Sequence, residues 1–447
     1  MDLMEALMAL ATLPEWLRAA LDPEQVLAVL VTALPRLDVR GVKIRRLLLD
    51  PGSGRWAGTY QVTTPAGTTA LRGTLNPPGR TGPARPAGDD VPFGGPGWHC
   101  HLPALGLDLE PQPAETALAV LPQLTDPERA RAIVADALGR PVDACAVDVL
   151  IYKPGSRAVL RYDLTYPPGT TGPAVVIAKT YRGAKGRNAH EAMAAMWRSR
   201  PAGPDAPALA EPLAWVPELN LLLQGTIPGE RTLEDELSSA LAGGDSDTAG
   251  RQLDATGAAL AAMHGSGARH GRTAALADRL GDARELLGRS PGIVPAPVLV
   301  QIGLLLARLE AVAAEHPPGP PVITHGTFSP EQVLLDGERV GFIDFDDACL
   351  AEPAMDAGLF LSALPDLAYE AGDRERAEAR MDQADAWGER FLTAYEARAP
   401  LSRTRVQLWQ AADFLVHALQ TWTKAKPAGP DKDLLILQRH LRAAQLA

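Results

Sequence analysis

The segment at residues 322–347, VITHGTFSPEQVLLDGERVGFIDFDD, most constrains how this chain can fold. It contains two short apolar stretches, residues 333–335 and 340–343, separated by an Asp-Gly-Glu turn. Such a turn between β-rich stretches is typical of a β-hairpin. A loop that begins with His-Gly precedes the hairpin, and an Asp-rich loop follows it. We therefore expect polar and acidic groups at both ends of one rigid hairpin, where they can converge on a metal-bound phosphate.

These two loops resemble the catalytic and metal-binding loops of the aminoglycoside phosphotransferase superfamily, which includes choline kinases and maltokinases. That family has a His-Gly-Asp motif, an Asn or Gln five residues after the Asp, and a further Asp near the end of the next strand. Here His325 and Gly326 begin the motif, Gln332 keeps the spacing, and Asp344 matches the second metal ligand. The resemblance implies an α+β, bilobal protein-kinase-like fold with a small β-rich N-lobe and a large helical C-lobe. It also implies that the protein uses ATP and Mg²⁺.

Thr327 departs from the family motif, because it occupies the position of the catalytic Asp. In the family this Asp accepts the proton of the attacking hydroxyl, and a threonine hydroxyl is not a base near neutral pH. His325 and Thr327 are therefore the candidate catalytic residues, with Thr327 at the position of the base. Asp346 and Asp347 are neighbouring carboxylates that could replace the missing one.

Three predicted strands, residues 146–152, 159–166 and 175–181, correspond to the β-rich lobe of the family. Lys179 lies inside the last of them, where a buried ammonium without a partner would be costly. In kinase-like enzymes a Lys-Glu pair holds the α- and β-phosphates, so we expect Glu191 in the following helix to be its partner. An edge strand with Lys179 facing water is the alternative.

Two further loops are expected to contact the nucleotide. The turn between the first two strands corresponds to the family's loop over the phosphates, which makes Gly155 and Ser156 candidates for backbone contacts. A plain hairpin is the alternative. The apolar stretch at residues 219–223 runs into a Pro-Gly turn and resembles the hinge between the lobes, with Gln224 and Thr226 next to adenine. A core strand that ends in a turn would have the same pattern.

Most of the remaining sequence has helical periodicity. His264, at the end of one predicted helix, matches a family histidine and is expected to pack. Asp356 matches the second Asp of the family's Asp-Pro-x-x-Asp element, which implies that it holds the backbone of the catalytic loop in place. Residues 230–254 are strongly acidic, and they either line a pocket for a cationic substrate or form a solvated helix face.

Residues 1–115 lie outside the resemblance and are interpreted as a cap-like segment. Its clearest helix is predicted at residues 24–34, since an Asp-Pro-Glu sequence caps it. Residues 42–75 indicate strands that we expect to form an antiparallel sheet, with the helices packed on one face.

The strands of this segment partly copy those of the β-rich lobe. Tyr60 aligns with Tyr162, and a Pro-x-Gly-Thr-Thr turn follows each tyrosine. A degenerate repeat would place Arg72 near the position of Lys179. Turn residues that recur by chance are the alternative.

Composition limits the remaining possibilities. A chain of 447 residues, 46% of them hydrophobic, can bury a large core in two or three domains. The net charge of −11 argues against a nucleic acid or an anionic membrane as partner. The acidic N-terminus and the lack of a long apolar run favour a cytoplasmic location, where the three scattered cysteines would stay reduced.

We therefore expect a cap-like segment at residues 1–115, a kinase-like N-lobe and hinge at residues 116–228, and a helical C-lobe at residues 229–447. One functional hypothesis is an ATP-dependent phosphotransferase that acts on an alcohol group of a small molecule. The other is a nucleotide-binding pseudokinase with a regulatory or scaffold role, because Thr327 lacks a carboxylate. The sequence identifies no particular phosphate acceptor.

Overall fold

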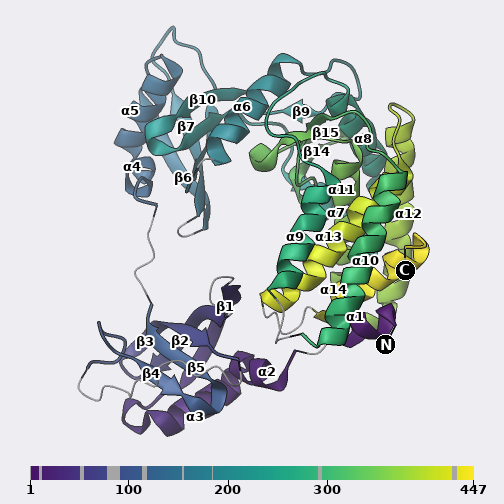
Figure 1. The fold of residues 1–447 in the computed structure, drawn as a ribbon. Helices are drawn as coiled ribbons and strands as arrows, with labels where there is room; N and C mark the ends of the chain where they lie inside the picture. Colours follow the sequence, from purple (N-terminus) through teal and green to yellow (C-terminus); the bar gives the residue numbers. More distant parts are fainter. Residues whose placement is uncertain are drawn as a thin grey trace. The chain divides into compact units, whose positions relative to one another are not determined.

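A computed structural model describes residues 2–9, 13–50, 55–77, 91–112, 118–153, 156–183, 185–289, 294–424 and 430–446. The fold is α+β, as expected (Figure 1). The chain forms two compact units. Unit 1 consists of Met1–Ala114, Ala277–Ala314 and Ala411–Ala447. Unit 2 consists of Glu115–Leu276 and Glu315–Gln410.

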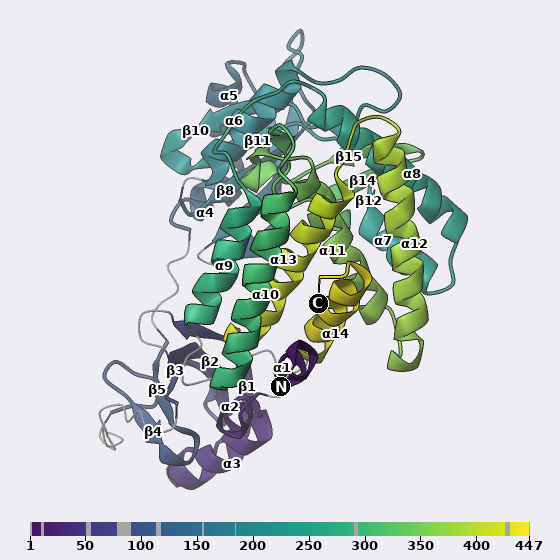
Figure 2. The ribbon, with the colours of Figure 1, turned by 45° about the vertical axis from the view of Figure 1, so that its right-hand side comes forward.

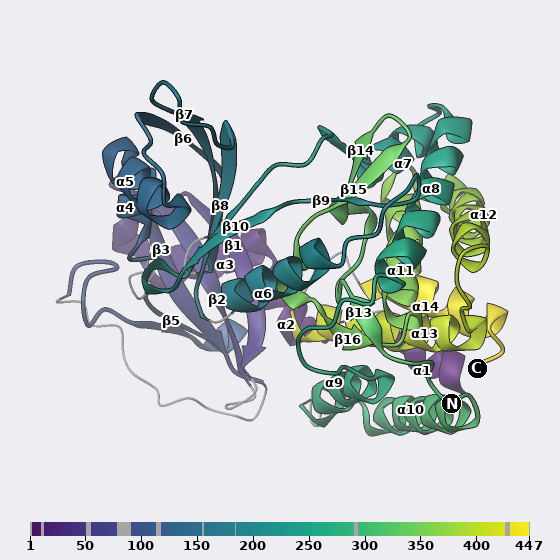
Figure 3. The same cartoon turned by 90° about the horizontal axis from the view of Figure 1, so that it is seen from above.

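Unit 2 begins with a small β-rich lobe built on a five-stranded antiparallel sheet. Its strands lie in the order β6 (Ala144–Lys153), β7 (Arg157–Thr165), β8 (Val175–Tyr181), β11 (Leu221–Gln224) and β10 (Pro212–Val216). Apolar residues alternate along β7 and β8, so one face of the sheet is buried under α4 (Leu121–Thr125) and α5 (Pro127–Leu138). The other face remains available for a ligand. Helix α6 (Lys185–Arg198) packs beside β8, β10 and β11 (Figure 3).

Local sequence explains the ends of α5. The Asp126 side chain accepts a hydrogen bond from the Arg129 amide, and Pro127 occupies the first helical turn. Gly139 ends the helix with a left-handed φ of 61°. Residues at or next to each end of α5 therefore set its bounds.

The larger lobe of unit 2 is mainly helical, and it carries the predicted hairpin. The hairpin strands β14 (Val333–Asp336) and β15 (Arg339–Phe342) belong to a sheet in the order β12-β14-β15-β9, and β13 pairs with β16. The remaining elements of this lobe are β9 (Ala208–Leu209), β12 (Arg231–Thr232), β13 (Val322–Thr324), β16 (Cys349–Ala351), α7 (Leu233–Leu241), α8 (Ser246–His264), α11 (Ala354–Glu370), α12 (Ala377–Glu396) and the start of α13 (Arg403–Thr423).

Unit 1 contains a second five-stranded antiparallel sheet, which confirms the sheet expected in the N-terminal segment. Its strands are β1 (Gly41–Asp50), β2 (Arg55–Thr64), β3 (Gly67–Leu75), β4 (Cys100–Leu102) and β5 (Leu107–Pro111). The helices α2 (Glu15–Leu21) and α3 (Pro23–Ala33) pack on it, and the Tyr60 hydroxyl donates a hydrogen bond to the Ala20 carbonyl at 3.1 Å.

The other helices of unit 1 are α1 (Leu3–Ala9), α9 (Leu276–Gly288), α10 (Ala296–Glu315), the end of α13 and α14 (Pro430–Ala443), several of which lie side by side in Figure 2. Contrary to the sequence expectation, one described helix, α10, is long and apolar enough to cross a membrane. Its Arg308 nevertheless binds the carbonyl groups of Gln445 and Leu446, and its Glu310 pairs with Arg284 of α9.

The two sheets have the same topology. In each, the strand order is first, second, third, fifth and fourth, and all neighbours are antiparallel. A 3₁₀ turn that begins with proline joins the last two strands in both, at Pro103–Leu105 and at Pro217–Leu219. Tyr162 donates to the Leu124 carbonyl at 3.0 Å, as Tyr60 does to Ala20.

The register of the two sheets corrects one expected equivalence. Ala57, three residues before Tyr60, pairs with Thr74, whereas Val159, three residues before Tyr162, pairs with Lys179. Thr74, not Arg72, therefore corresponds to Lys179. The expected offset was wrong because the loop between the second and third strands is longer in unit 2, which changes the numbering after it.

Candidate functional site

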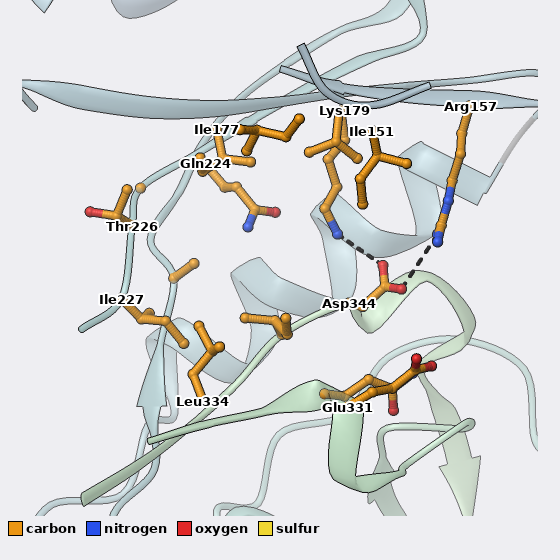
Figure 4. A pocket seen from close by; sticks show the side chains of 16 residues that line it. Ile151, Arg157, Ile177, Lys179, Gln224, Thr226, Ile227, Glu331, Leu334 and Asp344 are labelled. Carbon is orange, nitrogen blue, oxygen red and sulfur yellow. Dashed lines mark hydrogen bonds and ion pairs between the residues drawn. The ribbon is translucent and has the colours of Figure 1, made fainter. Parts of the chain in front are cut away.

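The N-lobe sheet and the hairpin β14–β15 of unit 2, with its flanking loops, line a cavity of about 390 Å³. This volume lies within the usual range for a small-molecule site. Aliphatic side chains form most of the wall, and the charged groups Arg157, Lys179, Asp344 and Glu331 lie toward one end (Figure 4). The lining residues are Leu150, Ile151, Arg157, Val159, Ile177, Lys179, Ala210, Gln224, Gly225, Thr226, Ile227, Glu331, Gln332, Leu334, Ile343 and Asp344.

Lys179 points into this cavity because it lies on the face of β8 opposite the buried core. Its Nζ lies 2.8 Å from Asp344 Oδ1, and the Lys179 side chain is only 12% exposed. The lysine therefore has the partner that its burial requires, but this partner is not Glu191. Glu191 is 51% exposed in α6 and lies 3.9 Å from His270 Nε2. The expected Lys179–Glu191 pair is thus wrong for this structure, because Asp344 satisfies the ammonium instead.

Asp344 is held at the cavity by an unusual backbone conformation and by two cations. Its φ of 71° is left-handed, a region that Asp adopts more readily than most residues. Arg157 Nη1 lies 3.4 Å from Asp344 Oδ2 (Figure 4). Burial by itself would raise the pKa of Asp344, but Lys179 above all, with Arg157, lowers this pKa to about 2. The carboxylate is therefore ionised in the folded protein near neutral pH.

Asp346 and Asp347, the two other acids of the loop, have partners in the N-lobe. The Tyr181 hydroxyl donates to Asp346 Oδ1 at 2.7 Å, and Arg157 Nη1 lies 3.4 Å from Asp346 Oδ2. Burial raises the pKa of Asp346, and Lys179 opposes this effect. Asp347 forms an ion pair with Lys185 at 2.9 Å. Both carboxylates that the sequence offered as alternatives to Thr327 therefore have partners in the N-lobe or in α6.

The backbone of the catalytic loop is fixed by Asp356, at the start of α11. Its carboxylate is buried and accepts hydrogen bonds from the His325 amide at 2.6 Å and the Gly326 amide at 2.9 Å. His264 Nε2 lies 3.1 Å from the same carboxylate, and His264 Nδ1 lies 2.8 Å from the Tyr395 hydroxyl. Asp356 and His264 therefore occupy the structural positions that the sequence suggested.

The His325 side chain does not reach the cavity. Its ring is fully buried, packs between Phe328 and Phe345, and donates from Nε2 to the Ile343 carbonyl at 2.8 Å. This bond connects the catalytic loop to the strand end before Asp344. A catalytic role for His325 is therefore wrong for this structure, and the residue positions the two loops instead.

Thr327 is exposed, and its Oγ1 lies 3.4 Å from Gln332 Nε2, which donates to it. The Gln332 carbonyl oxygen accepts a hydrogen bond from the Ser329 amide at 3.0 Å. Gln332 lines the cavity, yet its oxygen is already used within its own loop. The amide consequently presents its donor group to Thr327.

The other predicted nucleotide contacts have mixed outcomes. Gly155 lies outside the described residues. Ser156 is exposed, its amide donates to the Lys153 carbonyl at 3.0 Å, and it does not line the cavity, so its backbone stabilises the turn. Gln224 and Thr226 both line the cavity at the end of β11, and the Gln224 amide points into it (Figure 4).

The sequence interpretation did not identify Arg157 and Tyr181 as site residues. They are paired neighbours on β7 and β8, and both contact the acidic loop. Alternation provides the missed signal, because Arg157 lies two residues before Val159, the strand partner of Lys179. Glu331 also lines the cavity.

The site offers few oxygen ligands for a hard cation such as Mg²⁺. Mg²⁺ is commonly bound by one or two carboxylates together with substrate phosphates. Asp344 lines the cavity and can supply a carboxylate, with Lys179 and Arg157 now in contact with its two oxygens. The Gln332 oxygen accepts a hydrogen bond within its own loop, and Asp346 does not line the cavity. Within the described ranges, no group of three or more His, Cys, Asp or Glu side chains could hold a metal. Asp344 is therefore the principal protein ligand available.

Comparison with known proteins identifies the family. The sequence model of the Phosphotransferase enzyme family matches residues 163–432. No curated protein sequence matches the chain. Among solved structures, a choline/ethanolamine kinase family protein from Mesorhizobium loti is similar, with 18% identity and a TM-score of 0.46 over 72% of this chain and 99% of that chain.

A glucosamine kinase in complex with glucosamine, ADP and inorganic phosphate is similar over 96% of this chain and 100% of that chain, with 18% identity and a TM-score of 0.46. A putative fructosamine-3-kinase from Thermobifida fusca covers 71% of this chain and 98% of its own length, with 18% identity and a TM-score of 0.43. These likenesses are too distant to carry an argument, whereas the family match spans more than half of the chain. The chain belongs to the Phosphotransferase enzyme family.

Proposed function

We propose that this protein is an ATP-dependent small-molecule phosphotransferase with an atypical catalytic loop, in which Thr327 occupies the position of the base. The observation that carries the proposal is the contact between Lys179 and Asp344 at 2.8 Å in a cavity of about 390 Å³. It brings a buried cation of the N-lobe against an acid of the catalytic hairpin, 165 residues away in sequence. A cation and a potential metal ligand at one end of an aliphatic cavity suit a nucleoside triphosphate.

Each lining group has a role in this proposal. The aliphatic end, with Gln224 and Thr226, receives adenine, and Lys179 binds the phosphates. Mg²⁺, held by Asp344 and phosphate oxygens, would neutralise part of the phosphate charge. Phosphoryl transfer depends mainly on positioning and charge neutralisation, so a site without a carboxylate base can retain part of its activity. Thr327 Oγ1 would supply a neutral acceptor for the hydrogen bond of the attacking hydroxyl.

The catalytic loop favours a second candidate function, that of a nucleotide-binding pseudokinase. Thr327 already accepts a hydrogen bond from Gln332, and Asp346 and Asp347 both have cationic partners. A general base contributes about 10²- to 10⁴-fold to a reaction rate. A protein without one could therefore bind ATP as a regulatory or scaffold module and leave it unconverted.

The test measures nucleotide binding and turnover on the full chain. With ATP, Mg²⁺ and a panel of polyols, sugars and amino-alcohols, a phosphotransferase releases ADP in the presence of one class of acceptor. Asp344→Asn should abolish this release, and Asn tolerates the left-handed φ at this position. Asp336→Asn, at the exposed turn of the same hairpin, is the matched control and should retain activity.

The outcomes separate the two candidates. Thermal stabilisation by ATP without ADP release on any panel member would favour the pseudokinase. Absence of both stabilisation and release would reject nucleotide binding and with it both functions.

We further propose that the N-terminal sheet is a degenerate copy of the nucleotide lobe that no longer binds nucleotide. The shared strand order and the two tyrosine anchors support the duplication, and Thr74 at the position of Lys179 supports the loss. Calorimetry should then give one nucleotide per chain, and Lys179→Met should remove it. A second site that survives in Lys179→Met would contradict this proposal.

A further inference from the structure

Arg157 is the cation of the site that neither the family motif nor the sequence pattern assigns. It is the first residue of β7, directly after the turn that would cover the phosphates. Its side chain points toward the cavity from the same face of the sheet as Lys179 (Figure 4). The side chain is 27% exposed, so it combines partial burial with access to a ligand.

The present contacts of Arg157 are loose and use a small part of the guanidinium. Both carboxylate contacts, to Asp344 and Asp346, involve Nη1 and are 3.4 Å long. Within the described part of the chain, Nε and Nη2 make no hydrogen bond. A guanidinium has five donors in a planar fork that matches phosphate oxygens. Arg157 therefore keeps most of its donors available for an anion.

Release of Arg157 would not leave either carboxylate without a partner. Asp344 would keep Lys179 at 2.8 Å, and Asp346 would keep the Tyr181 hydroxyl at 2.7 Å. The Arg157 contacts are also long, at 3.4 Å, whereas the contacts that would remain are short. The two acids thus hold the arginine near the cavity without trapping it there.

The metal site increases the need for a further fixed cation. Asp344 is its principal protein ligand, since the Gln332 oxygen accepts a hydrogen bond from the Ser329 amide. The phosphates of ATP must nevertheless be neutralised for binding and transfer. Lys179 and Arg157 together supply two positive charges at the same end of the cavity.

We propose that Arg157 binds the phosphates of the nucleotide. Its guanidinium then neutralises part of the phosphate charge that divalent cations neutralise in other phosphotransferases. This inference rests on the nucleotide binding of the proposed function. The affinity for the nucleotide should depend less on Mg²⁺ than it would if Lys179 were the only cation of the site. The arginine moves from the two carboxylates to the phosphates when a nucleotide enters. Its role is in binding and positioning, and it is separate from proton transfer.

The test is calorimetric titration of the full chain with ATP, once with excess EDTA and once with Mg²⁺, and with adenosine as a probe that lacks phosphates. Wild-type protein should bind ATP in EDTA within about tenfold of its affinity in Mg²⁺. Arg157→Gln should weaken ATP binding in EDTA by about tenfold or more, which is the scale of a lost hydrogen bond to a charged group. Its affinity for adenosine should not change.

Two further variants serve as controls. Arg157→Lys keeps the charge without the planar fork, so it should lose less affinity than Arg157→Gln. Arg161→Gln removes the same charge from an exposed arginine of β7 that pairs with Asp163 and does not line the cavity. It should bind ATP as the wild type does.

The outcomes distinguish failure of this inference from failure of the proposed function. Unchanged ATP affinity of Arg157→Gln in EDTA would refute the role of Arg157. If the wild-type protein bound ATP with Mg²⁺ but not with EDTA, the role of Arg157 would also be refuted. Nucleotide binding as a function would still stand. No binding in either condition would overturn the proposed function and this inference together.

Discussion

Replacement of Asp356 should show how strongly one buried carboxylate supports the catalytic loop. The residue is fully buried in the first turn of α11. One oxygen accepts from the Gly326 amide at 2.9 Å, and the other accepts from the His325 amide at 2.6 Å. His264 Nε2 lies 3.1 Å from the second oxygen. Three potential donors therefore depend on a single side chain.

The expected cost follows from these contacts. Asp356→Ala leaves two buried amide groups without an acceptor, at about 1–3 kcal/mol each, and removes the contact with His264. A loss of about 3–6 kcal/mol is a large part of the 5–15 kcal/mol that usually stabilises a domain. Asp356→Asn keeps one carbonyl oxygen and should lose about half as much.

Urea unfolding followed by tryptophan fluorescence would measure these losses, together with ATP binding as a reading of the loop itself. Asp143→Ala removes an exposed carboxylate of unit 2 and should stay within about 0.5 kcal/mol of the wild type. An Asp356→Ala protein with the same urea midpoint of unfolding as the wild type would refute the reasoning. It would mean that water or a rearranged loop satisfies the two amides at no cost.

Three further predictions concern the same loops. Thr327→Asp should raise turnover by about ten- to a thousandfold if the acceptor pocket is intact; unchanged turnover with ATP still bound would support the pseudokinase, and a loss would show that the threonine itself takes part. Gly326→Ala should cost about 1–3 kcal/mol in urea unfolding, because φ is 88° and a Cβ would lie 2.1 Å from the Asp347 carbonyl oxygen. Gly337→Ala, where φ is 64° but no atom lies within 4 Å, should cost less, and equal costs would reject the steric argument. The pKa of Asp344 is held at about 2, below its ordinary value of 3.8, so its charge contributes stability that is present above about pH 4 and is lost as the pH falls toward about 2. Lys179→Met should therefore lower the urea midpoint more at about pH 6 than at about pH 2.5, and an equal shift at both would contradict the assignment.

Local sequence determined the elements that depend on neighbouring residues. Asp126 and Gly139 set the ends of α5, and the Asp-Gly turn set the hairpin that carries Asp344, because caps and turns involve groups only a few residues apart. The same locality explains why Lys179 could be recognised as a buried cation that needs a partner. The order of the two loops around this hairpin also sufficed, through the resemblance to a known family, to predict the α+β fold.

Tertiary structure decided which groups meet. Lys179 pairs with Asp344 and not with Glu191, and the Arg157 contacts join residues almost two hundred positions apart, which no local rule specifies. Burial of the His325 ring likewise depends on Phe328 and Phe345, which pack around it in the folded loop. The equivalence of Thr74 and Lys179 required the strand register, since a longer loop shifts the numbering between the two sheets. The chain's elements could therefore be predicted from local sequence, whereas the ion pairs that define the site arise from packing between distant segments.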